Sequence, residues 1–400
     1  MVYRLLASDR KILCLVCLLL LAGCPSKPPK EVKQTPTLVR VSKDQVPGFV
    51  DDLDVGSLQK AIRQSLKFYE RVPADRTYSL GNLQIQAKLL KSTLVKFLTL
   101  LDSGRLDSDA VYQAFDIYRF QQGKSEAELL LTGYYEPILN GKLEPDGDYR
   151  YPLYSVPPDL LTIDLASFNP ELYAGKSLKG RLEGSHVVPY YSRQEIDSQG
   201  KLQGHDCELV WLASPLDVFF LQIQGSGMIQ LPGGKVVRVG YAASNGRPYR
   251  SIGKFLLNKG VMKREEISLQ TIRSYLEAHP EVQQEVLWHN ESYVFFRLVE
   301  DGPLGSLNVP LTAGRSIATD PQYFPKGGIA FLQSEKPRID ANGGVTGWEP
   351  LHRWVVNQDV GGAIKGAKRA DLFCGSGESA EQVAGRLKHP GKLYFLINKQ

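Results

Sequence analysis

Two aspartates near the C-terminus are the residues whose type and spacing best suit chemistry. Asp359 and Asp371 enclose a glycine-rich stretch, and short β-type runs at residues 352–357 and 372–373 flank them. Glycine lets the backbone turn back tightly, so two acids distant along the chain can project toward one cleft from strand ends. Carboxylates in a shared cleft can divide acid and base roles at neutral pH. The alternative is a pair of solvated turn residues.

Two adjacent tyrosines occur in Gly133-Tyr134-Tyr135-Glu136-Pro137. This motif lies where helical spacing of apolar residues gives way to short β-rich runs. Neighbouring residues on a strand face opposite sides, so we expect one tyrosine in the core and the other free to meet a ligand. An aromatic ring with a polar tip suits a sugar, which presents C–H faces edged by hydroxyls. Packing of both rings is the alternative.

A second polar motif, Gln222-Ile223-Gln224-Gly225-Ser226-Gly227, ends a strongly apolar run. It lacks the third glycine and the following helix of a dinucleotide-binding loop. Gln224 also occupies the first glycine position of the elbow that a nucleophilic Ser226 would need. We therefore expect either a bulged hairpin or a place where Gln224 and Ser226 hydrogen-bond a polar ligand. Two further polar loops, at residues 240–253 and 310–320, suit either ligand contact or simple connection.

The N-terminus has the layout of a secretory signal peptide. Basic residues precede an apolar run at residues 12–21 that is too short to span a bilayer comfortably. The following Leu-Ala-Gly-Cys24 resembles a bacterial lipobox, which implies that Cys24 is the lipidated first residue of the mature chain; ordinary secretion is the alternative. Pro25 follows where an aspartate would resemble an inner-membrane retention signal, which favours the outer membrane. Residues 25–37 are rich in proline and lysine and indicate a tether.

Charge and cysteine content exclude several classes of function. Removal of residues 1–23 lowers the formal net charge from +5 to about +3, and the basic residues form no stripe with interleaved aromatics, so nucleic-acid binding is not indicated. Cys207 and Cys374 are the cysteines left beside Cys24 after cleavage, too few for a disulfide framework, although they could pair. The histidines lack metal-ligand spacing, so we expect no metal and no cofactor.

The spacing of apolar residues divides the mature chain into helical regions and β-rich regions. Helical spacing covers residues 55–122, with Asp107 or Ser108 as a possible cap of the last helix, and it returns at residues 251–287. Between and after these lie short β-rich runs with turn signals, including residues 216–224, 228–231 and 235–241. No βαβ rhythm appears, so a doubly wound parallel sheet is disfavoured and one or two small barrels are favoured.

Taken together, these motifs resemble the membrane-bound lytic murein transglycosylase A family, from about residue 85 to the end. The segments that carry the resemblance are 133–137, 188–193, 224–227, 240–253, 310–320 and 359–371, the last being similar to the family's aspartate-rich "3D" module. The family implies a mainly β fold with a helical N-terminal segment: a double-psi β-barrel, an inserted second β-barrel-like domain, and a glycan groove between them.

The resemblance also implies domain boundaries. They give a signal peptide at 1–23, a tether at 24–50, the helical segment and first barrel part at 51–137, the insert at 138–296, and the module that completes the barrel at 297–400. The implied substrate is the glycan strand of peptidoglycan, with the outer membrane reached through the lipid anchor and cell-wall synthesis or division proteins as possible partners. The implied location is the periplasmic face of that membrane.

The resemblance implies a lytic exotransglycosylase that cleaves the bond from N-acetylmuramic acid to N-acetylglucosamine without water. Asp371 would protonate the leaving oxygen and then, as a carboxylate, take the proton of the muramic C6 hydroxyl, whose oxygen closes on C1 to give a 1,6-anhydro end. Asp359 would support it, and Asp340 is the least certain third aspartate. We expect sugar contacts from Tyr134, Tyr135, Gln224 and Ser226, and weaker ones from Arg315 and Lys365.

Two other functions stay open at this point. A hydrolase would use Asp359 as the nucleophile or as the base for a water, and the separation of the two carboxyl groups would tell a retaining pair from an inverting one. A wall-binding lipoprotein without turnover would bind glycan and release no product.

Overall fold

A closed β-barrel forms one part of the molecule. The computed structural model describes residues 36–122, 125–126, 128–341 and 343–399. Six strands close the ring through hydrogen bonds, because the last strand of the chain pairs with a different strand of the ring on each of its two edges. In ring order they are β20 (Lys388–Asn398), β17 (Ile329–Ile339), β18 (Val345–Asp359), β16 (Ser316–Ala318), β19 (Arg369–Ser376) and β6 (Leu129–Glu136). The predicted barrel is confirmed.

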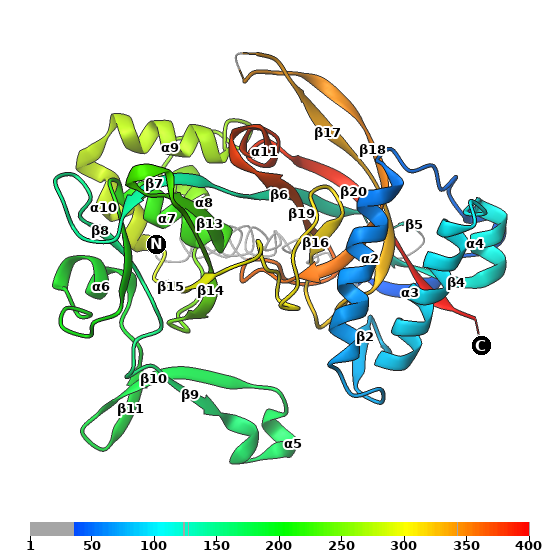
Figure 1. Cartoon of the computed structure of the whole chain (residues 1–400), viewed down its shortest axis with the longest axis horizontal. Helices are drawn as coiled ribbons and strands as arrows, with labels where there is room; N and C mark the ends of the chain where they lie inside the picture. Colours follow the sequence, from blue (N-terminus) through cyan, green and yellow to red (C-terminus); the bar gives the residue numbers. More distant parts are fainter. Residues whose placement is uncertain (1–35, 123–124, 127, 342, 400) are drawn as a thin grey trace, which may run out of the picture. The chain divides into compact units, whose positions relative to one another are not determined.

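Helices from the N-terminal segment pack on the barrel (Figure 1). They are α2 (Val55–Glu70), α3 (Ala87–Asp102) and α4 (Ser108–Ala114), with the hairpin of β2 (Thr77–Leu80) and β3 (Leu83–Gln86) between the first two. Trp354 of β18 is fully buried where they meet, and the Phe49, Phe97 and Phe331 rings lie 4.8–4.9 Å from its centroid. Burial of aromatic rings therefore holds the helical segment on the barrel.

The predicted helical region ends earlier than expected. Asp107 caps α4 by accepting from the Ala110 amide, as predicted, but the helix stops at Ala114. The next stretch is strand β4 (Phe115–Gln122), which pairs with β20 and with β1 (Thr37–Arg40) and β5 (Ser125–Glu126). The helical expectation for residues 115–122 was wrong because Phe115 and Ile117 are buried with an intervening polar residue, the period of a strand.

The region between β6 and the rest of the barrel contains a second, six-stranded sheet. Its order is β15 (Val294–Val299), β14 (Val236–Ser244), β13 (Ser226–Gln230), β7 (Ile138–Lys142), β12 (Glu208–Leu212) and β8 (Tyr151–Tyr154). Around it lie α6 (Arg193–Gln199), α7 (Pro215–Gln224), α8 (Ile252–Asn258), α9 (Leu269–Ala278) and α10 (Pro280–His289). The helices at 252–289 confirm the predicted helical stretch, and the hairpin of β13 and β14 confirms the predicted strands.

The strand expected at residues 216–224 is instead helix α7. Ser214 caps it by accepting from the Leu216 amide, Pro215 occupies its first turn, and Gly225 ends it in the left-handed conformation at φ 81°. A continuous apolar run fits a buried helix and a buried strand equally well. The capping serine, the first-turn proline and the terminal glycine are the signals that decide for the helix.

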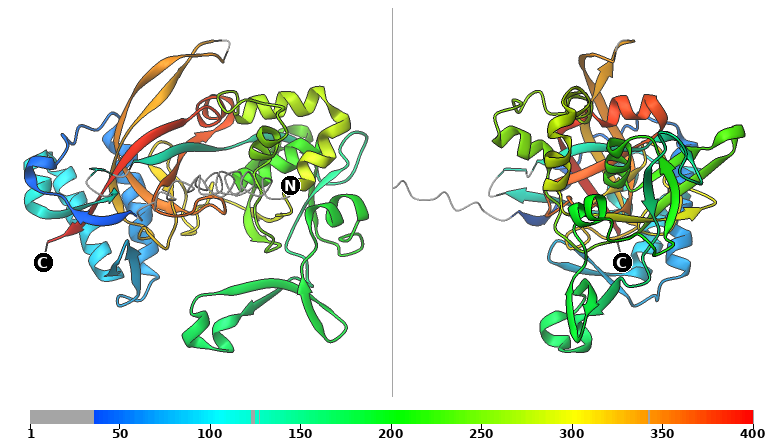
Figure 2. Two further views of the ribbon diagram at one scale, coloured as in Figure 1. Left: turned by 180° about the vertical axis from the view of Figure 1, so that it is seen from behind. Right: turned by 90° about the vertical axis from the view of Figure 1, so that its left-hand side faces the viewer.

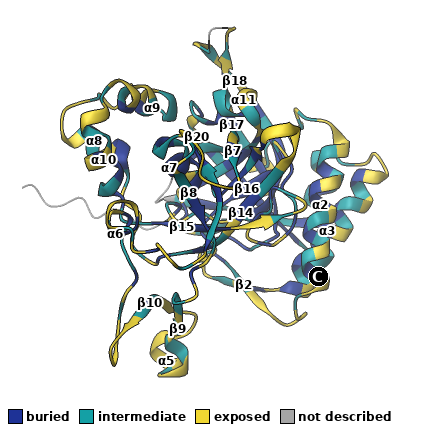
Figure 3. Ribbon diagram, turned by 60° about the vertical axis from the view of Figure 1, so that its left-hand side comes forward, coloured by how far each residue is buried: buried dark blue, intermediate teal, exposed yellow. Residues whose placement is uncertain are grey.

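A smaller three-stranded sheet, with η2 (Leu165–Ser167) and α5 (Pro170–Tyr173), stands apart from both regions (Figures 1 and 2). Its strands are β9 (Leu161–Asp164), β10 (Ser177–Glu183) and β11 (His186–Pro189). Figure 3 shows that burial is concentrated in the barrel and the six-stranded sheet. Within the described ranges, no helix is long and apolar enough to cross a membrane.

A buried ion pair ties the barrel to the inserted sheet. Glu136, at the end of β6, is fully buried and accepts from Arg238 of β14 at 2.8 Å and from the Ser376 hydroxyl of β19 at 2.7 Å. Removing one partner of a buried pair leaves an uncompensated charge, so this junction resists separation. The connection matters for the site, since Glu136 lies two residues beyond Tyr134 on the same strand.

Candidate active site

The short strand β16 brings the two predicted aspartates together. Ala318 pairs with Asp359 of β18 on one side and with Asp371 of β19 on the other. The β16–β18 register shifts by a bulge just before Ala318, which brings Asp359 opposite this residue. Two strand spacings place the Cα atoms of the two aspartates about 10 Å apart. The sequence predicted that the two acids share one region, and the pairing of β16 places them on either side of a single residue.

Asp359 is held by donors that are fixed in place. Its Oδ1 accepts from the backbone amides of Ser306 and Val360, each at 2.9 Å, and its Oδ2 accepts from the Tyr134 hydroxyl at 3.0 Å. Burial raises the pKa of Asp359 to about 6, and these hydrogen bonds together with the charge of Lys326 act in the opposite direction. Asp359 therefore gains and loses its proton near neutral pH.

Asp371 has a different set of partners, and they come from side chains. Its Oδ1 accepts from the Thr132 hydroxyl at 2.5 Å and from Arg369 Nε at 3.1 Å, and Arg369 Nη2 lies 3.3 Å from Oδ2. The Arg369 side chain is 34% exposed, whereas that of Asp371 is 16% exposed. A hydroxyl can rotate and a part-exposed arginine can move, so Asp371 can exchange its partners.

Thr132 and Arg369 were missed from the sequence, although the strand period could have identified them. Thr132 lies two residues before Tyr134 on β6, and Arg369 lies two residues before Asp371 on β19. Side chains at i and i+2 share one face of a strand. Once the acids and the tyrosine are candidates, the residues two positions before them become candidates too.

The two tyrosines of the motif have different surroundings, as predicted. Tyr134 is part-buried, bonds to Asp359 and lies against Phe373 with 5.4 Å between ring centroids. Burial raises its pKa well above the usual range, and the nearby Asp359 and Asp371 carboxylates raise it further. Tyr135 is 4% exposed and packs in a small cluster with Ala380 and Ala384 of α11 (Gly377–Ala384). Tyr134 therefore stays a ligand candidate, and Tyr135 is a core residue.

The glycine before these tyrosines has a packing reason. A Cβ atom on Gly133 would lie 2.7 Å from the Ala384 backbone, closer than real Cβ contacts allow. Gly133 thus permits α11 to approach β6 directly behind the site.

The inserted region contributes Tyr249 to the neighbourhood of Asp371. Tyr249 follows β14 in the polar loop singled out from the sequence, and its side chain is 38% exposed. Burial raises its pKa; Arg369 and the Ser251 side chain lower it, and Asp371 raises it. The charges of Arg369 and Asp371 therefore act on a residue of the insert.

Only one glycine of the stretch between the aspartates adopts the conformation that the turn was expected to require. Gly366 has φ 80°, and its amide donates to Asp320 Oδ2 at 2.7 Å. Asp320 is 4% exposed, so a buried carboxylate of the polar loop at 310–320 holds the turn in place through this hydrogen bond. Lys365 is exposed at the surface of this turn, where a ligand contact remains a prediction. Asp340 accepts from the Gly344 amide at 2.7 Å in the β17–β18 turn.

Gln224 and Ser226 are placed for structure at least as much as for ligand contact. Gln224 ends α7, and its Oε1 accepts from the Tyr135 amide at 3.0 Å, which links the helix to β6. Ser226 is 8% exposed and pairs with Gly240 in the β13–β14 hairpin. The sugar contacts predicted for Gln224 and Ser226 remain predictions. Gln224 is connected to the candidate site by its hydrogen bond with the Tyr135 amide.

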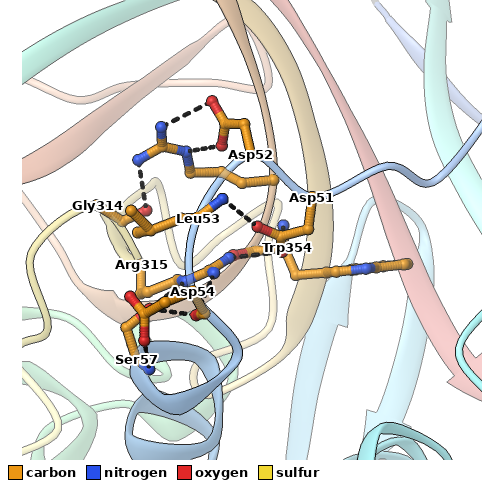
Figure 4. Close-up of polar contacts among 9 residues, drawn as sticks. Asp51, Asp52, Leu53, Asp54, Ser57, Gly314, Arg315 and Trp354 are labelled. Atoms are coloured by element: carbon orange, nitrogen blue, oxygen red, sulfur yellow. Dashed lines mark hydrogen bonds and ion pairs between the residues drawn. The ribbon is translucent and has the colours of Figure 1, made fainter. Parts of the chain in front are cut away.

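Arg315 takes a structural role in place of the predicted sugar contact. Its side chain is fully buried, and its guanidinium donates to Asp51 Oδ2 at 2.6 Å, to the Asp54 and Trp354 carbonyls at 2.9 Å and to the Ser57 hydroxyl at 3.0 Å (Figure 4). Beside it, Arg353 forms a two-point pair with Asp52. These bonds fix the start of α2 against β18, and none is directed to solvent.

Cys207 and Cys374, the cysteines among the described residues, are free thiols. Burial raises the pKa of Cys207 to about 11 and that of Cys374 to about 12. Cys24 lies outside the described residues. Among the residues that the structure describes, no group of three or more histidines, cysteines or acids is placed to hold a metal ion.

Comparisons with known proteins point to one family. A family model described as the MltA specific insert domain matches residues 130–297, and a 3D domain model matches residues 315–397. Membrane-bound lytic murein transglycosylase A of Escherichia coli strain K12 is 32% identical over 284 residues, 70% of this chain and 69% of that protein.

Solved structures give the same result. A crystal structure of a membrane-bound lytic murein transglycosylase from Agrobacterium tumefaciens matches with a TM-score of 0.75 and 31% identity, over 90% of this chain and 98% of that one. A structure of Escherichia coli MltA with bound chitohexaose matches with a TM-score of 0.69 and 26% identity, over 94% of this chain and 98% of that one.

Proposed function

Because the chain belongs to the membrane-bound lytic murein transglycosylase A family, we propose that it cleaves the glycan strands of peptidoglycan by transglycosylation. The observation that carries the proposal is the placement of Asp359 and Asp371 on either side of Ala318, with two backbone donors on Asp359 and side-chain donors on Asp371. A binder without turnover needs no such pair of carboxylates.

Asp371 is the proton carrier in this proposal. The Thr132 hydroxyl and the Arg369 guanidinium are the groups that a bound sugar would displace or share, after which Asp371 protonates the oxygen that leaves the muramic C1 atom. An oxocarbenium-like centre develops at C1. The carboxylate then takes the proton of the C6 hydroxyl of the same sugar, and that oxygen bonds to C1. The attack is intramolecular and gains from proximity.

Asp359 supports this chemistry through Tyr134. Its two backbone donors cannot reverse direction, so they keep its Oδ1 an acceptor, and its Oδ2 orients the Tyr134 hydroxyl. Tyr134 and the part-exposed Tyr249 are our candidates for sugar contact, one from each region of the chain. The predicted boundaries of the insert at 138–296 and of the completing module at 297–400 stay part of this proposal.

One observation favours a second function, hydrolysis of the glycan. The pKa of Asp359 is raised to about 6, as expected of a general acid, and Arg369 pairs with Asp371. In that scheme Asp359 donates the proton and Asp371 activates a water.

Digestion of purified peptidoglycan separates the two schemes. We expect soluble fragments that end in 1,6-anhydromuramic acid, lighter by one water than the hydrolysis products and without a reducing end. Mass analysis, with reduction by borohydride as the check for reducing ends, measures this directly. Products that carry the extra water would contradict transglycosylation, and absence of soluble products would contradict catalysis.

We also propose that Cys24 is lipidated and anchors the chain to the periplasmic face of the outer membrane. The signal-peptide layout and the lipobox-like Leu-Ala-Gly-Cys support it. Metabolic labelling with a radioactive fatty acid should label the wild type and leave a Cys24→Ser variant unlabelled. Label that persists in the variant would contradict the anchor.

A further inference from the structure

A cavity of about 330 Å³ lies within the inserted region, among residues that take no part in the contacts of Asp359 or Asp371. It is bordered by β8, α6, α7 and α10, and by Tyr293 just before β15. Its walls combine aromatic and aliphatic side chains, such as Tyr154 and Trp288, with polar and charged ones. A cavity of this size with a few convergent polar groups is the usual form of a small-molecule site.

Two opposite charges face each other in this cavity. Arg193 is 2% exposed, with Nε donating to the Asn290 carbonyl and Nη2 donating to Gln222 Oε1 and the Ser292 carbonyl. Its remaining nitrogen, Nη1, lies 4.0 Å from Asp197 Oδ2, beyond hydrogen-bond distance. Each charge therefore keeps capacity to bond a third group, and the Asp197 side chain is 33% exposed.

The surroundings hold both charges in place. The Arg193 guanidinium lies 4.6 Å from the centroid of the Phe219 ring and 5.0 Å from that of Tyr293, so aromatic faces support the cation. Burial raises the pKa of Asp197 to about 6, while Arg193 and Tyr293 act to lower it. At neutral pH the cavity thus presents one fixed cation and one carboxylate, and Arg150 adds a second cation among its lining residues.

A ligand that satisfies this arrangement carries an anionic and a cationic group a few atoms apart. The free Nη1 of Arg193 can donate a charge-assisted hydrogen bond to a carboxylate oxygen. A carboxylate such as Asp197 accepts from an ammonium group in the same way. The apolar walls leave room for the carbon skeleton between them. The chemical class with both groups at this spacing is the amino acid or short peptide.

We propose that this cavity binds a zwitterionic amino-acid or peptide group, with its carboxylate on Arg193 and its ammonium on Asp197. Two sources share this chemistry: free peptides in the medium, and peptides attached to the glycan on which the proposed activity operates. The second source rests on the proposed function, whereas the binding itself does not.

Calorimetric titration of the purified full chain with D-alanyl-D-alanine tests the binding, because the only charges of this dipeptide are its two ends. We expect saturable binding, weakened at least tenfold when the dipeptide is N-acetylated or carries a C-terminal amide. Asp197→Asn should weaken binding of the free dipeptide at least tenfold. Glu285→Gln, on the same helix as Trp288 and paired with Lys259, is the matched control and should leave it unchanged.

Tryptophan fluorescence gives a second readout that does not depend on Asp197, because Trp288 borders the cavity. The dipeptide should change the emission of the wild type, and Trp288→Phe should remove that change while calorimetric binding persists. Absence of saturable binding, or equal binding of the dipeptide and its two blocked forms, would overturn the proposal.

Digestion of two forms of peptidoglycan, with and without attached peptides, then separates the sources. If attached peptides are the natural ligand, Asp197→Asn should lower the ratio of kcat/KM on peptide-bearing glycan to that on bare glycan at least fivefold. If free peptides are the ligand, added dipeptide should change the wild-type rate on both forms by the same factor. Release of anhydro products by the wild type tests the proposed function independently of either result.

Discussion

Two arginine–aspartate pairs in the barrel differ in how completely their surroundings satisfy them. Arg315 and Asp51 lie at the start of α2, where the arginine is fully buried and donates to four oxygens (Figure 4). Arg369 and Asp371 lie on β19, where the arginine is one-third exposed and shares its acid with the Thr132 hydroxyl. The residue types are the same, and the contacts differ.

The difference separates a structural pair from a candidate catalytic one. Every bond of Arg315 joins elements of the fold, so breaking one leaves a buried charge without a partner. Arg369 has one fixed acceptor, the Ala363 carbonyl at 3.2 Å. Its other bonds join side chains beside a part-exposed carboxylate, and water or a substrate can replace those. Both sites contain an ion pair. They differ in how many N–H groups of the arginine donate to acceptors that are fixed by the fold.

The largest expected effect is loss of activity on removing the acid of the exposed pair. Asp371→Asn should lower the rate of fragment release at least about 10³-fold, since its amide cannot carry the proton. Unfolding by urea should shift little, because a neutral acceptor still bonds to Thr132. Asp359→Asn should cost about tenfold. If Asp359→Asn is the more severe change, the acid role belongs to Asp359 and the hydrolase scheme gains.

The second effect is on stability and concerns the buried pair. Arg315→Met should lower the free energy of unfolding by about 3–5 kcal/mol, because Asp51 and two backbone carbonyls lose their donor. The rate per folded molecule should stay within about twofold of wild type, which activity measured well below the unfolding transition checks. A large loss of rate without loss of stability would restore Arg315 as a candidate for sugar contact.

A third test uses the pH dependence of stability. The pKa of Asp359 is raised to about 6 in the fold, above its ordinary value of 3.8, so its ionised form is disfavoured there. The free-energy cost of holding ionised Asp359 in the fold is absent below about pH 4 and complete above about pH 6. Wild type should therefore lose stability relative to Asp359→Asn as pH rises. Between pH 4 and pH 7.5, the free energy of unfolding of Asp359→Asn relative to wild type should rise by roughly 2 kcal/mol, as measured by urea unfolding. An equal difference at both values would contradict the raised pKa.

The smallest expected effect on stability comes from the exposed arginine. Arg369→Met should change the free energy of unfolding by less than about 1 kcal/mol, since a part-exposed pair contributes little. Its rate should nevertheless fall about tenfold, because Asp371 loses the donor that orients it. Arg369→Lys should recover part of the rate, as a single ammonium replaces a two-point contact. A stability loss as large as that of Arg315→Met would remove the distinction between the pairs.

Much of the site follows from alternation along strands, and part does not. Tyr134 and Tyr135 separate into a site residue and a core residue because neighbours on a strand face opposite sides. The same rule could have added Thr132 and Arg369. The burial of Arg315 could not be predicted, because a polar loop in the sequence gives no sign that other elements close over it. The strand expected at 216–224 was misjudged because an apolar run has no period to separate a buried helix from a buried strand.

The sequence by itself determined which residue types are available, their alternation along each strand, and through Asp107, Ser214 and Pro215 where helices begin. It also carried the family resemblance that joined distant motifs. The tertiary structure decided that β16 stands between the two aspartates, that Asp359 is held by fixed donors and Asp371 by exchangeable ones, and that Arg193 and Asp197 face each other in a cavity. These facts depend on strand pairing and burial between segments far apart along the chain, which no local pattern encodes.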